Sequence, residues 1–584
     1  SLRHQAENVR GWIVVALVAL APLWLIGLFD RGLWTPDEPR EADIAWNMAH
    51  QHERALPRLA GVPFLEKPPL SYWLSAGALH VFGESARAAR APNLLYAAVA
   101  TVALGALAAA AAGAEAAVVA ALLAGSALLG IRVAVWLAPD AGLLAGCACG
   151  LLGAYLGYIS PPGRRKLAGY TLMHAGAALG FMAKSAPGWL VPALALGGLL
   201  VWERRWRELR RWELYAGLLL QALVIAPWVA AVVSTPEGAS ALRVLFWNNL
   251  VGRFTRVAAP TALDYTRGHA NSPGKYLLEL PVGLLPWTPL VVAALARAWY
   301  RVRAHDAAAT AWRFSLTASL PFLALLSVAA TARDIYAAPV ILGLSLLVGL
   351  WWVQVRQGLS ALDRGALVSV RMLVAVITVL LALALGVFAA TAPTSLARDT
   401  LALLALAQIT LSLAALARAG RAQRAGHARR SLSWTFIAYA ASVCLACLGA
   451  FPVIDQWQNL GALAARIHAD TATDTLAVLD ADETTIAMLD DRLATRFVVL
   501  QADTVPAAQA VSSWFNAHGS RARVLVLLPG HAAGEITPLI ERVMTVSRPD
   551  DGVAGILAIQ NVARIVARYE LPHGRRYALL APAA

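Results

Sequence analysis

The sequence predicts an α-helical protein that crosses a membrane many times and ends in a small α/β domain outside it. Of its 584 residues, 59% are hydrophobic and 14% are charged, whereas soluble domains are about 45–50% apolar and about 25% charged. The apolar residues gather in blocks of roughly the 20 residues that a helix needs to span a bilayer. After residue 452, short apolar runs alternate with amphipathic stretches, which is typical of an α/β domain.

Thirteen apolar blocks are predicted to be transmembrane helices, and together they assign residues 1–452 to a membrane domain. The thickness of the bilayer sets the length that each block needs. The blocks are centred near residues 20, 100, 125, 148, 175, 194, 223, 287, 320, 345, 377, 407 and 442.

Basic residues favour alternate loops, and this gives the chain an orientation. Arg3 and Arg10 precede the first block, and the basic loops at 164–166, 204–211 and 418–430 fall on the same side. Short cytoplasmic loops of membrane proteins are rich in Lys and Arg, so we expect a cytoplasmic N-terminus. The net charge of +14 then reflects topology, and no nucleic-acid partner is expected.

The extracytoplasmic side receives the loops at about 30–88 and 235–275 and everything after residue 452. The loop at 235–275 is basic, although basic loops are expected on the cytoplasmic side. An anionic ligand would explain its charge, because Arg and Lys are the usual phosphate binders; pairing with lipid headgroups is the alternative. Against Glu237 and Asp264, the loop carries Arg243, Arg253, Arg256, Arg267 and Lys275.

Residues 453–584 are predicted to be a separate soluble α/β domain. They contain no Gly-rich phosphate loop and no Ser-His-Asp spacing, so we expect a structural or docking role. The expected strands are 475–479, 496–500, 523–528 and 555–559, and the expected helices include 460–468 and 506–517.

Cys444 and Cys447 have the spacing of a redox or metal pair. All four Cys residues of the chain lie in apolar blocks. Inside a predicted membrane helix, small apolar packing residues are the better interpretation of this pair.

Two acidic residues on the extracytoplasmic side are candidates for chemistry. Asp37 precedes a predicted helix, and Asp140 is at the start of another span on the same side. Two carboxylates at one membrane surface can position a nucleophile, bind a metal or balance a developing sugar cation. Capping of the following helix is the alternative for both. For Glu38 we expect only an interaction with the helix dipole.

Glu66 and Lys67 place an acid and a base beside a rigid Pro-Pro turn. Three of the four Lys residues of the chain, Lys67, Lys184 and Lys275, are on the extracytoplasmic side, where a compact ammonium group suits a phosphate oxygen. Glu66 and His269 could ligate a divalent ion, because both residue types bind zinc. Two residues alone are a weak metal signal.

Several motifs follow one another in a recognisable order, and together they resemble the GT-C membrane glycosyltransferases that use polyprenyl-phosphate sugars. Within this family they are similar to the branch that transfers 4-amino-4-deoxy-L-arabinose to lipid A. Thirteen spans followed by an α/β tail also resemble that branch, so the resemblance covers nearly the whole chain. The motifs are Asp37-Glu-Pro-Arg40, Leu65-Glu-Lys-Pro-Pro-Leu-Ser-Tyr-Trp73, Phe82-Gly83, Arg87–Arg90, Pro139-Asp140 and Phe181-Met-Ala-Lys-Ser185.

The resemblance implies a role for most of these candidates. Asp37 would be the principal catalytic carboxylate and Asp140 the second acid. Arg40 and Lys67 would hold the phosphate of the lipid carrier. Glu66 and His269 would match a pair associated with a divalent ion, zinc.

Tyr336 would match a Tyr near the carrier phosphate, and here the chain departs from the family pattern. Ala332 replaces a Lys four residues before this Tyr, so we expect Arg333 to supply the charge. The usual Lys-Gly step is Lys184-Ser185 in this chain, which leaves Lys184 as a substrate-binding candidate.

The function that the resemblance implies is transfer of 4-amino-4-deoxy-L-arabinose from undecaprenyl phosphate to a phosphate of lipid A, which gives polymyxin resistance. The expected location is the bacterial inner membrane, with the active site and the C-terminal domain in the periplasm, and the expected state is a monomer among membrane lipids. The alternatives are a protein O-mannosyltransferase, a lipid-linked sugar transporter and a membrane scaffold. A transporter predicts ionisable residues near mid-bilayer, whereas the charges here gather at one face.

Overall fold

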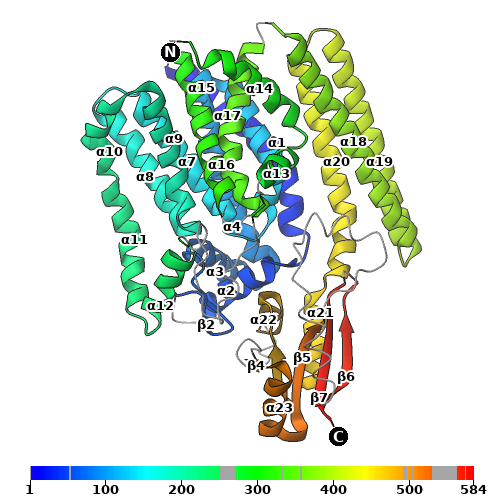
Figure 1. Ribbon diagram of the computed structural model, residues 1–584. Helices are drawn as coiled ribbons and strands as arrows, with labels where there is room; N and C mark the ends of the chain where they lie inside the picture. The colour runs from blue at the N-terminus through cyan, green and yellow to red at the C-terminus, as the bar shows by residue number, and fades with distance from the viewer. Residues whose placement is uncertain are drawn as a thin grey trace.

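The computed structural model of the chain consists of a helical bundle and a smaller α/β domain at one end of it (Figure 1). Helices α2 (Glu38–His50) and α3 (Leu70–Phe82) lie where the two parts meet. The structure describes residues 2–50, 54–249, 251, 271–272, 274–304, 306–329, 333–355, 358–490, 496–500, 506–528, 562–572 and 574–583.

The bundle forms from the predicted apolar blocks, since each predicted centre lies in a helix or in a bent helix pair. Within the described residues, nine helices are long and apolar enough to cross a membrane, or eleven if each bent pair is one span. A multi-span membrane protein is therefore confirmed, while the count of thirteen stays a prediction. The bundle helices are α1 (Leu2–Phe29), α4 (Ala86–Ala112), α5 (Ala114–Ser126), α6 (Leu128–Val135), α7 (Asp140–Ile159), α8 (Arg164–Lys184), α9 (Pro187–Glu203), α10 (Trp212–Ala216), α11 (Leu218–Val233), α13 (Lys275–Gly283), α14 (Thr288–Arg301), α15 (Ala307–Thr317), α16 (Leu320–Val328), α17 (Ala338–Val355), α18 (Ala361–Thr391), α19 (Ser395–Arg424) and α20 (Ala428–Trp457).

Helices α7 and α8 pack with their backbones unusually close. A Cβ atom at Gly153 of α7 would lie 2.1 Å from the backbone nitrogen of Met173, and one at Gly146 would lie 2.4 Å from that of Gly180. Small residues allow this approach between membrane helices. The contact matters for function because Asp140 begins α7 and Lys184 ends α8.

Short elements connect the bundle on both sides. On the side of the α/β domain they are β1 (Arg58–Leu59), β2 (Val62–Pro63), α12 (Gly238–Arg243), the π-helical turn Val244–Asn248 and the 3-10 turn η5 (Asp334–Ala337). At the other end, the 3-10 turn Trp206–Arg210 joins α9 to α10.

The C-terminal domain has a five-stranded sheet in the order β4-β3-β5-β7-β6. Strand β3 runs parallel to β4 and β5, and β7 runs antiparallel to β5 and β6. Side chains of β3 alternate between two apolar clusters, one on each face, which explains its continuous apolar sequence. The elements are α21 (Leu460–Thr471), β3 (Thr475–Leu479), α22 (Glu483–Asp490), β4 (Phe497–Leu500), α23 (Ala507–His518), β5 (Ala522–Leu528), β6 (Ala563–Glu570) and β7 (Arg576–Pro582), with a 3-10 turn at Gly519–Arg521.

Three of the four expected strands form where the sequence predicts them, as do both expected helices. The fourth, at 555–559, lies outside the described residues. Strands β6 and β7 and helix α22 were not predicted. Strand β6 is an edge strand with several exposed residues and charged side chains, so it lacks the apolar pattern that identified the others. Helix α20 continues to Trp457, past the expected domain boundary at 452.

The end of α20 is tied to the loop that precedes α2. The Asp455 carboxylate accepts hydrogen bonds from the Gly32 amide at 2.9 Å and from the Trp34 indole at 2.6 Å. The side-chain oxygen of Gln458 accepts from both the amide and the hydroxyl of Thr35 at 3.0 Å. The junction of the two domains therefore holds the segment that leads to Asp37.

Candidate active site

Glu38 anchors the start of α2 in the protein interior. Its side chain is completely buried, and Arg31 donates to its two oxygens at 2.5 and 2.8 Å. The Arg90 Nε lies 3.2 Å away, and the amides of Trp34 and Leu137 donate at 2.8 and 2.9 Å. The expectation that Glu38 only complements the helix dipole is wrong, because two cations and two backbone amides converge on it. Through Leu137, Glu38 also fixes α2 to the segment that leads into α7.

Asp37 is a buried carboxylate held by two arginines. Arg333 donates to both of its oxygens, at 3.1 and 2.7 Å, and an Nη of Arg40 lies 3.4 Å away. Burial alone would raise the pKa of Asp37, but the positive charges of Arg333, Arg40 and Lys67 outweigh it and lower that pKa well below its usual range. Asp37 is therefore ionised at neutral pH.

Arg40 and Lys67 each bind more than one carboxylate. Arg40 donates to Glu41 at 3.2 and 2.7 Å, and its remaining Nη donates to Glu483 of α22. The Lys67 ammonium donates to Glu41 at 3.0 Å and lies 3.4 Å from Glu66. Burial would lower the pKa of Lys67, but Glu41 and Glu66 raise it above its usual value. Both basic side chains are therefore charged.

Asp140 forms a second ion pair on the same side of the bundle. Lys184 donates to Asp140, and its ammonium lies 4.7 Å from the centre of the Tyr336 ring. Tyr336 belongs to η5, which directly follows Arg333. The short segment from Arg333 to Tyr336 thus reaches both ion-pair groups, and its backbone is held by the Tyr276 hydroxyl, which donates to the Arg333 carbonyl at 3.1 Å.

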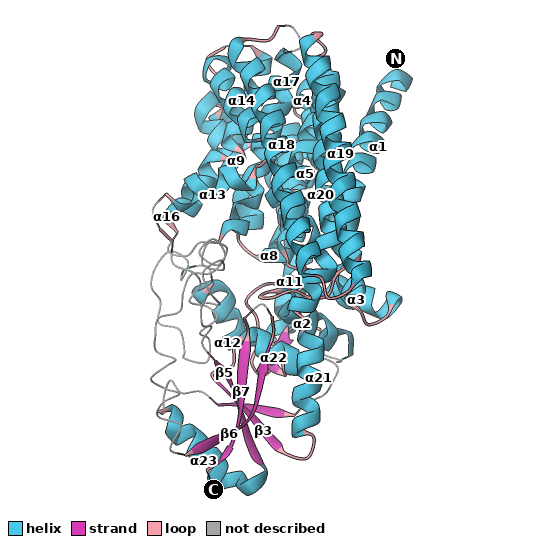
Figure 2. Cartoon of the chain, turned by 90° about the vertical axis from the view of Figure 1, so that its right-hand side faces the viewer, coloured by secondary structure: helices cyan, strands magenta, loops and turns pink. Residues whose placement is uncertain are grey.

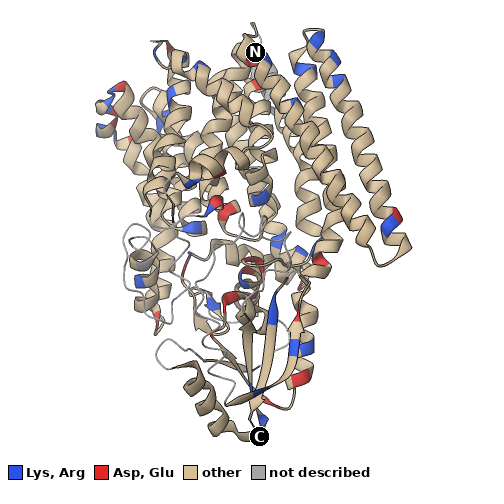
Figure 3. Ribbon diagram, turned by 45° about the vertical axis from the view of Figure 1, so that its right-hand side comes forward, with Lys and Arg blue, Asp and Glu red and all other residues tan. Residues whose placement is uncertain are grey.

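Acidic and basic residues lie where the bundle meets the α/β domain and at the opposite end of the bundle, whereas its middle is nearly free of them in the described chain (Figure 3). The cations next to the α/β domain are placed to hold an anionic ligand at the membrane surface. Two groups of charged residues make up the site, one around Asp37 and one around Asp140, and together they have one more acid than base. The acids are Asp37, Glu41, Glu66, Asp140 and Glu483, and the bases are Arg40, Lys67, Lys184 and Arg333.

Eight of the nine residues predicted for the site lie in these two groups, and the ninth, His269, lies outside the described residues. The sequence reasoning missed Glu41 and Glu483. Glu41 follows Arg40 on α2 and could have been found from its place in the motif. Glu483 carries no comparable signal, because it reaches Arg40 across 443 residues of chain.

The expected metal site is described only in part. Glu66 lies beside Lys67, and the Asn249 side chain donates to its backbone carbonyl at 2.9 Å. No three His, Cys, Asp or Glu side chains come together as a metal site within the described ranges. Because His269 lies outside those ranges, a divalent ion at this pair stays a prediction.

The basic loop at 235–275 contributes two ion pairs to the described structure. Arg58 donates to Glu237 at 3.2 Å, and Lys275 lies 3.6 Å from Glu279. Arg253, Arg256 and Arg267 lie outside the described residues. The expected anion-binding role of this loop therefore stays a prediction.

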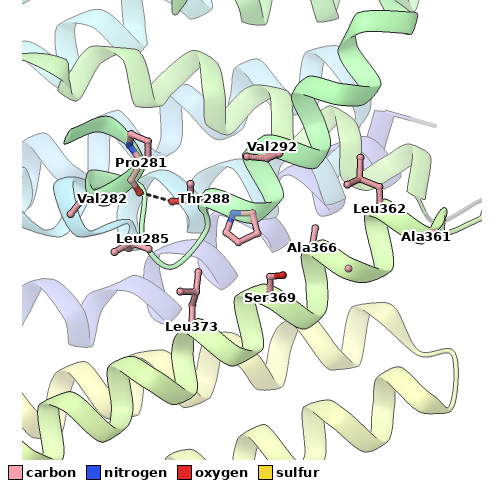
Figure 4. A pocket seen from close by; sticks show the side chains of 12 residues that line it. Pro281, Val282, Leu285, Thr288, Val292, Ala361, Leu362, Ala366, Ser369 and Leu373 are labelled. Atoms are coloured by element: carbon pink, nitrogen blue, oxygen red, sulfur yellow. Dashed lines mark hydrogen bonds between the residues drawn. The ribbon is translucent and has the colours of Figure 1, made fainter. Parts of the chain in front are cut away.

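An apolar groove of about 820 Å³ lies between the bent pair α13–α14 and helix α18 (Figure 4). Figure 4 shows Pro281, Val282 and Leu285 on one side and Leu362 and Leu373 on the other. The Thr288 hydroxyl donates to the Pro281 carbonyl at 2.6 Å, so its polar hydrogen is satisfied within the bend. An apolar groove of this kind suits a hydrocarbon chain.

Known proteins resemble this chain in sequence. A family described as dolichyl-phosphate-mannose-protein mannosyltransferase matches residues 66–230. The undecaprenyl phosphate-alpha-4-amino-4-deoxy-L-arabinose arabinosyl transferase of Pseudomonas paraeruginosa is 30% identical over 379 residues, which are 61% of this chain and 63% of that protein. The enzyme of the same name from Edwardsiella ictaluri is 27% identical over 344 residues, 58% of this chain and 59% of that protein. The chain thus matches less than two thirds of the length of these relatives.

The fold is shared over almost the full length of a solved protein. The crystal structure of ArnT from Cupriavidus metallidurans bound to undecaprenyl phosphate matches with a TM-score of 0.69 and 19% identity, covering 98% of both chains. The chain therefore has the fold of this solved protein, and residues 66–230 match the mannosyltransferase family. The apo crystal structure of the same Cupriavidus protein matches with a TM-score of 0.66. The expected resemblance is confirmed, as is a helical membrane bundle followed by a small α/β domain, whereas the count of thirteen spans stays a prediction.

Proposed function

We propose that this chain transfers 4-amino-4-deoxy-L-arabinose from undecaprenyl phosphate to a phosphate of lipid A. The observation that carries the proposal is the convergence of Arg40, Lys67 and Arg333 around Asp37 and Glu41, where the bundle meets the α/β domain. Three cations, of which Arg40 is buried and Lys67 and Arg333 are partly buried, suit the phosphate of a lipid carrier at a membrane surface. The names of the relatives supply the sugar and the carrier.

The reaction exchanges one phosphate for another on the anomeric carbon of the sugar. The bond from that carbon to the carrier phosphate breaks, and its electron pair leaves with undecaprenyl phosphate. A lone pair on a lipid A phosphate oxygen forms the new bond. Arg40, Lys67 and Arg333 would stabilise the charge that develops on the leaving phosphate, as preorganised cations do in other transfer enzymes.

Asp37 suits this reaction as an ionised carboxylate. A phosphate acceptor is already anionic near neutral pH, so no strong general base is required. With its lowered pKa, Asp37 cannot act as a general acid, but it can stabilise positive charge that develops on the sugar. Asp140 and Lys184, beside Tyr336, would orient a second anionic group, and the acceptor phosphate is our assignment for it.

The proposal also includes a cofactor and a location. Glu66 and His269 would hold a divalent ion, zinc, whose charge would help to offset the repulsion between two phosphates. The protein would lie in the bacterial inner membrane with its N-terminus in the cytoplasm and its site in the periplasm. One chain carries every assigned residue, so we assign a monomer.

The test is an in vitro reaction with purified chain, a synthetic polyprenyl-phosphate aminoarabinose donor and lipid A. Mass spectrometry should detect lipid A that is heavier by one aminoarabinose. A parallel reaction replaces the donor with polyprenyl-phosphate mannose and the acceptor with a Ser/Thr peptide. Product only in this second reaction would contradict the proposal.

Protein O-mannosylation is the second candidate, and the family match over residues 66–230 favours it. Its acceptor is a hydroxyl group, which must lose a proton to a base. Asp37 is paired with Arg333 and has a lowered pKa, and both features make it a weak base. The geometry therefore supports the phosphate acceptor better.

A further inference from the structure

Helix α22 of the C-terminal domain packs against α2 of the bundle, as Figure 2 shows. The Thr484 hydroxyl donates to the carbonyl of Pro36 at 3.2 Å, and the Asn47 amide donates to Asp490 at 3.3 Å. Next to Thr484, at the start of α22, Glu483 accepts from Arg40. The C-terminal domain therefore reaches into the group of charges around Asp37.

Most of the N–H groups of Arg40 have carboxylate partners without any ligand. A guanidinium has five N–H donors in a fixed plane, and four hydrogen bonds join those of Arg40 to Glu41, Asp37 and Glu483. For Arg40 to hold a phosphate with two N–H groups, at least one of these carboxylates has to leave. The structure indicates which of the three is easiest to displace.

Glu483 is the most accessible of the three carboxylates. Its side chain is 26% exposed, compared with 3% for Glu41 and 10% for Asp37. Glu41 also binds Lys67, and Asp37 also binds Arg333, so each keeps a second cation. Glu41 and Asp37 flank Arg40 in sequence, whereas Glu483 comes from another domain and can withdraw without unfolding α2.

The electrostatic surroundings of Glu483 also favour exchange. Burial raises its pKa and the nearby charge of Glu66 raises it further, while Arg40 and Lys67 lower it. The site has one more acid than base, so without the Glu483 carboxylate the two would be equal in number. If a phosphate takes the place of Glu483 on Arg40, the guanidinium still has an anionic partner. The exchange also moves one acid away from Glu66.

We propose that Glu483 occupies the position on Arg40 that the donor phosphate takes, so that the C-terminal domain competes with the donor and sets its affinity. The inference rests on the proposed function, because it assigns Arg40 to the carrier phosphate. It gives the C-terminal domain a role at the site in addition to its own folding. When the donor phosphate displaces Glu483 from Arg40, the Glu483 carboxylate lies next to the bound donor.

The test measures binding of undecaprenyl phosphate to the full chain in nanodiscs. The Glu483→Gln variant keeps the shape of the side chain and removes its charge, so the Kd should fall by about tenfold, the effect of one hydrogen bond to a charged group. The matched control is Asp490→Asn on the same helix and interface, which should leave the Kd unchanged. Arg40→Ala should weaken binding of both the parent chain and the Glu483→Gln variant.

The outcomes separate this inference from the proposed function. If the parent chain does not bind undecaprenyl phosphate, or if Arg40→Ala binds it equally well, the assignment of the carrier site fails. If Arg40→Ala weakens binding but Glu483→Gln does not tighten it, only the inference fails. If Glu483→Gln lowers the thermal stability more than Asp490→Asn does, the Glu483→Asp variant is measured in its place. Its shorter side chain keeps the charge but reaches Arg40 less well, so binding of undecaprenyl phosphate should still be tighter than in the parent chain. Unchanged binding would overturn the inference.

Discussion

Replacing Arg333 tests the arrangement around Asp37 most directly. Arg333→Ala removes two charge-assisted hydrogen bonds, at 3.1 and 2.7 Å, from a buried carboxylate. Each such bond contributes about 1.5–3 kcal/mol, and neighbouring contributions overlap rather than add. We therefore expect a loss of about 3 kcal/mol of transition-state stabilisation, which lowers kcat/KM by about 10²-fold.

The pH profile gives this prediction a second readout. In the parent chain, Arg333 is the strongest of the charges that lower the pKa of Asp37. Without Arg333, burial is opposed mainly by Arg40 and Lys67, so that pKa rises. Since we propose that Asp37 acts in its ionised form, activity of the variant should fall off on the acid side at a higher pH than in the parent chain.

The assay is kcat/KM for aminoarabinose transfer from pH 4 to pH 8. Arg132→Ala is the matched control, because Arg132 pairs with Asp334, next in sequence to Arg333, but both partners are about a third exposed or more. An exposed pair contributes about 0–1 kcal/mol, so the control should lose fivefold at most. A variant at position 333 that matches the control in rate and in pH profile would refute the role that we give to Arg333.

Three other predictions concern the same site. Asp37→Asn and Lys67→Ala should each abolish polymyxin resistance in cells that lack the native enzyme; full resistance at normal expression would remove that residue from the site. Glu38→Gln should destabilise the folded chain by about 3–5 kcal/mol, because it leaves buried cations without a counter-charge, and an unchanged Tm would contradict this account. Glu66→Gln should lower the zinc content of the purified protein, measured by elemental analysis, while Glu237→Gln serves as a control that keeps it. Equal zinc in both variants would count against a metal at Glu66.

The sequence predicts the bundle well because local composition encodes it. A bilayer requires long apolar helices, and a helix satisfies its own backbone hydrogen bonds. The three correctly predicted strands of the C-terminal domain have apolar sequences, which are largely buried in β3 and β5 and partly exposed in β4. Strands β4 and β6 are both edge strands, but β6 carries charged residues, which an edge tolerates, and it was missed for that reason.

The candidate residues stand in local sequence motifs, whereas their partners do not. Motifs near Asp37, Lys67, Asp140 and Lys184 identify these side chains one by one. Their pairing depends on contacts between segments far apart, such as Arg333 with Asp37 across 296 residues. No local sequence pattern predicts a contact between residues so far apart along the chain. The position of Glu38 at a helix start likewise predicts only a minor role, because its partners Arg90 and Leu137 are distant in sequence.

The sequence by itself determined that this is a polytopic membrane protein that resembles the GT-C glycosyltransferases, and which charged side chains are candidates for its site. Hydrophobic length and motif spacing are local properties, so they can be read without a fold. Only the tertiary structure decided which charges meet. It brings Arg333 to Asp37 and Glu483 to Arg40, because the packing of helices against one another and against the C-terminal domain fixes those distances.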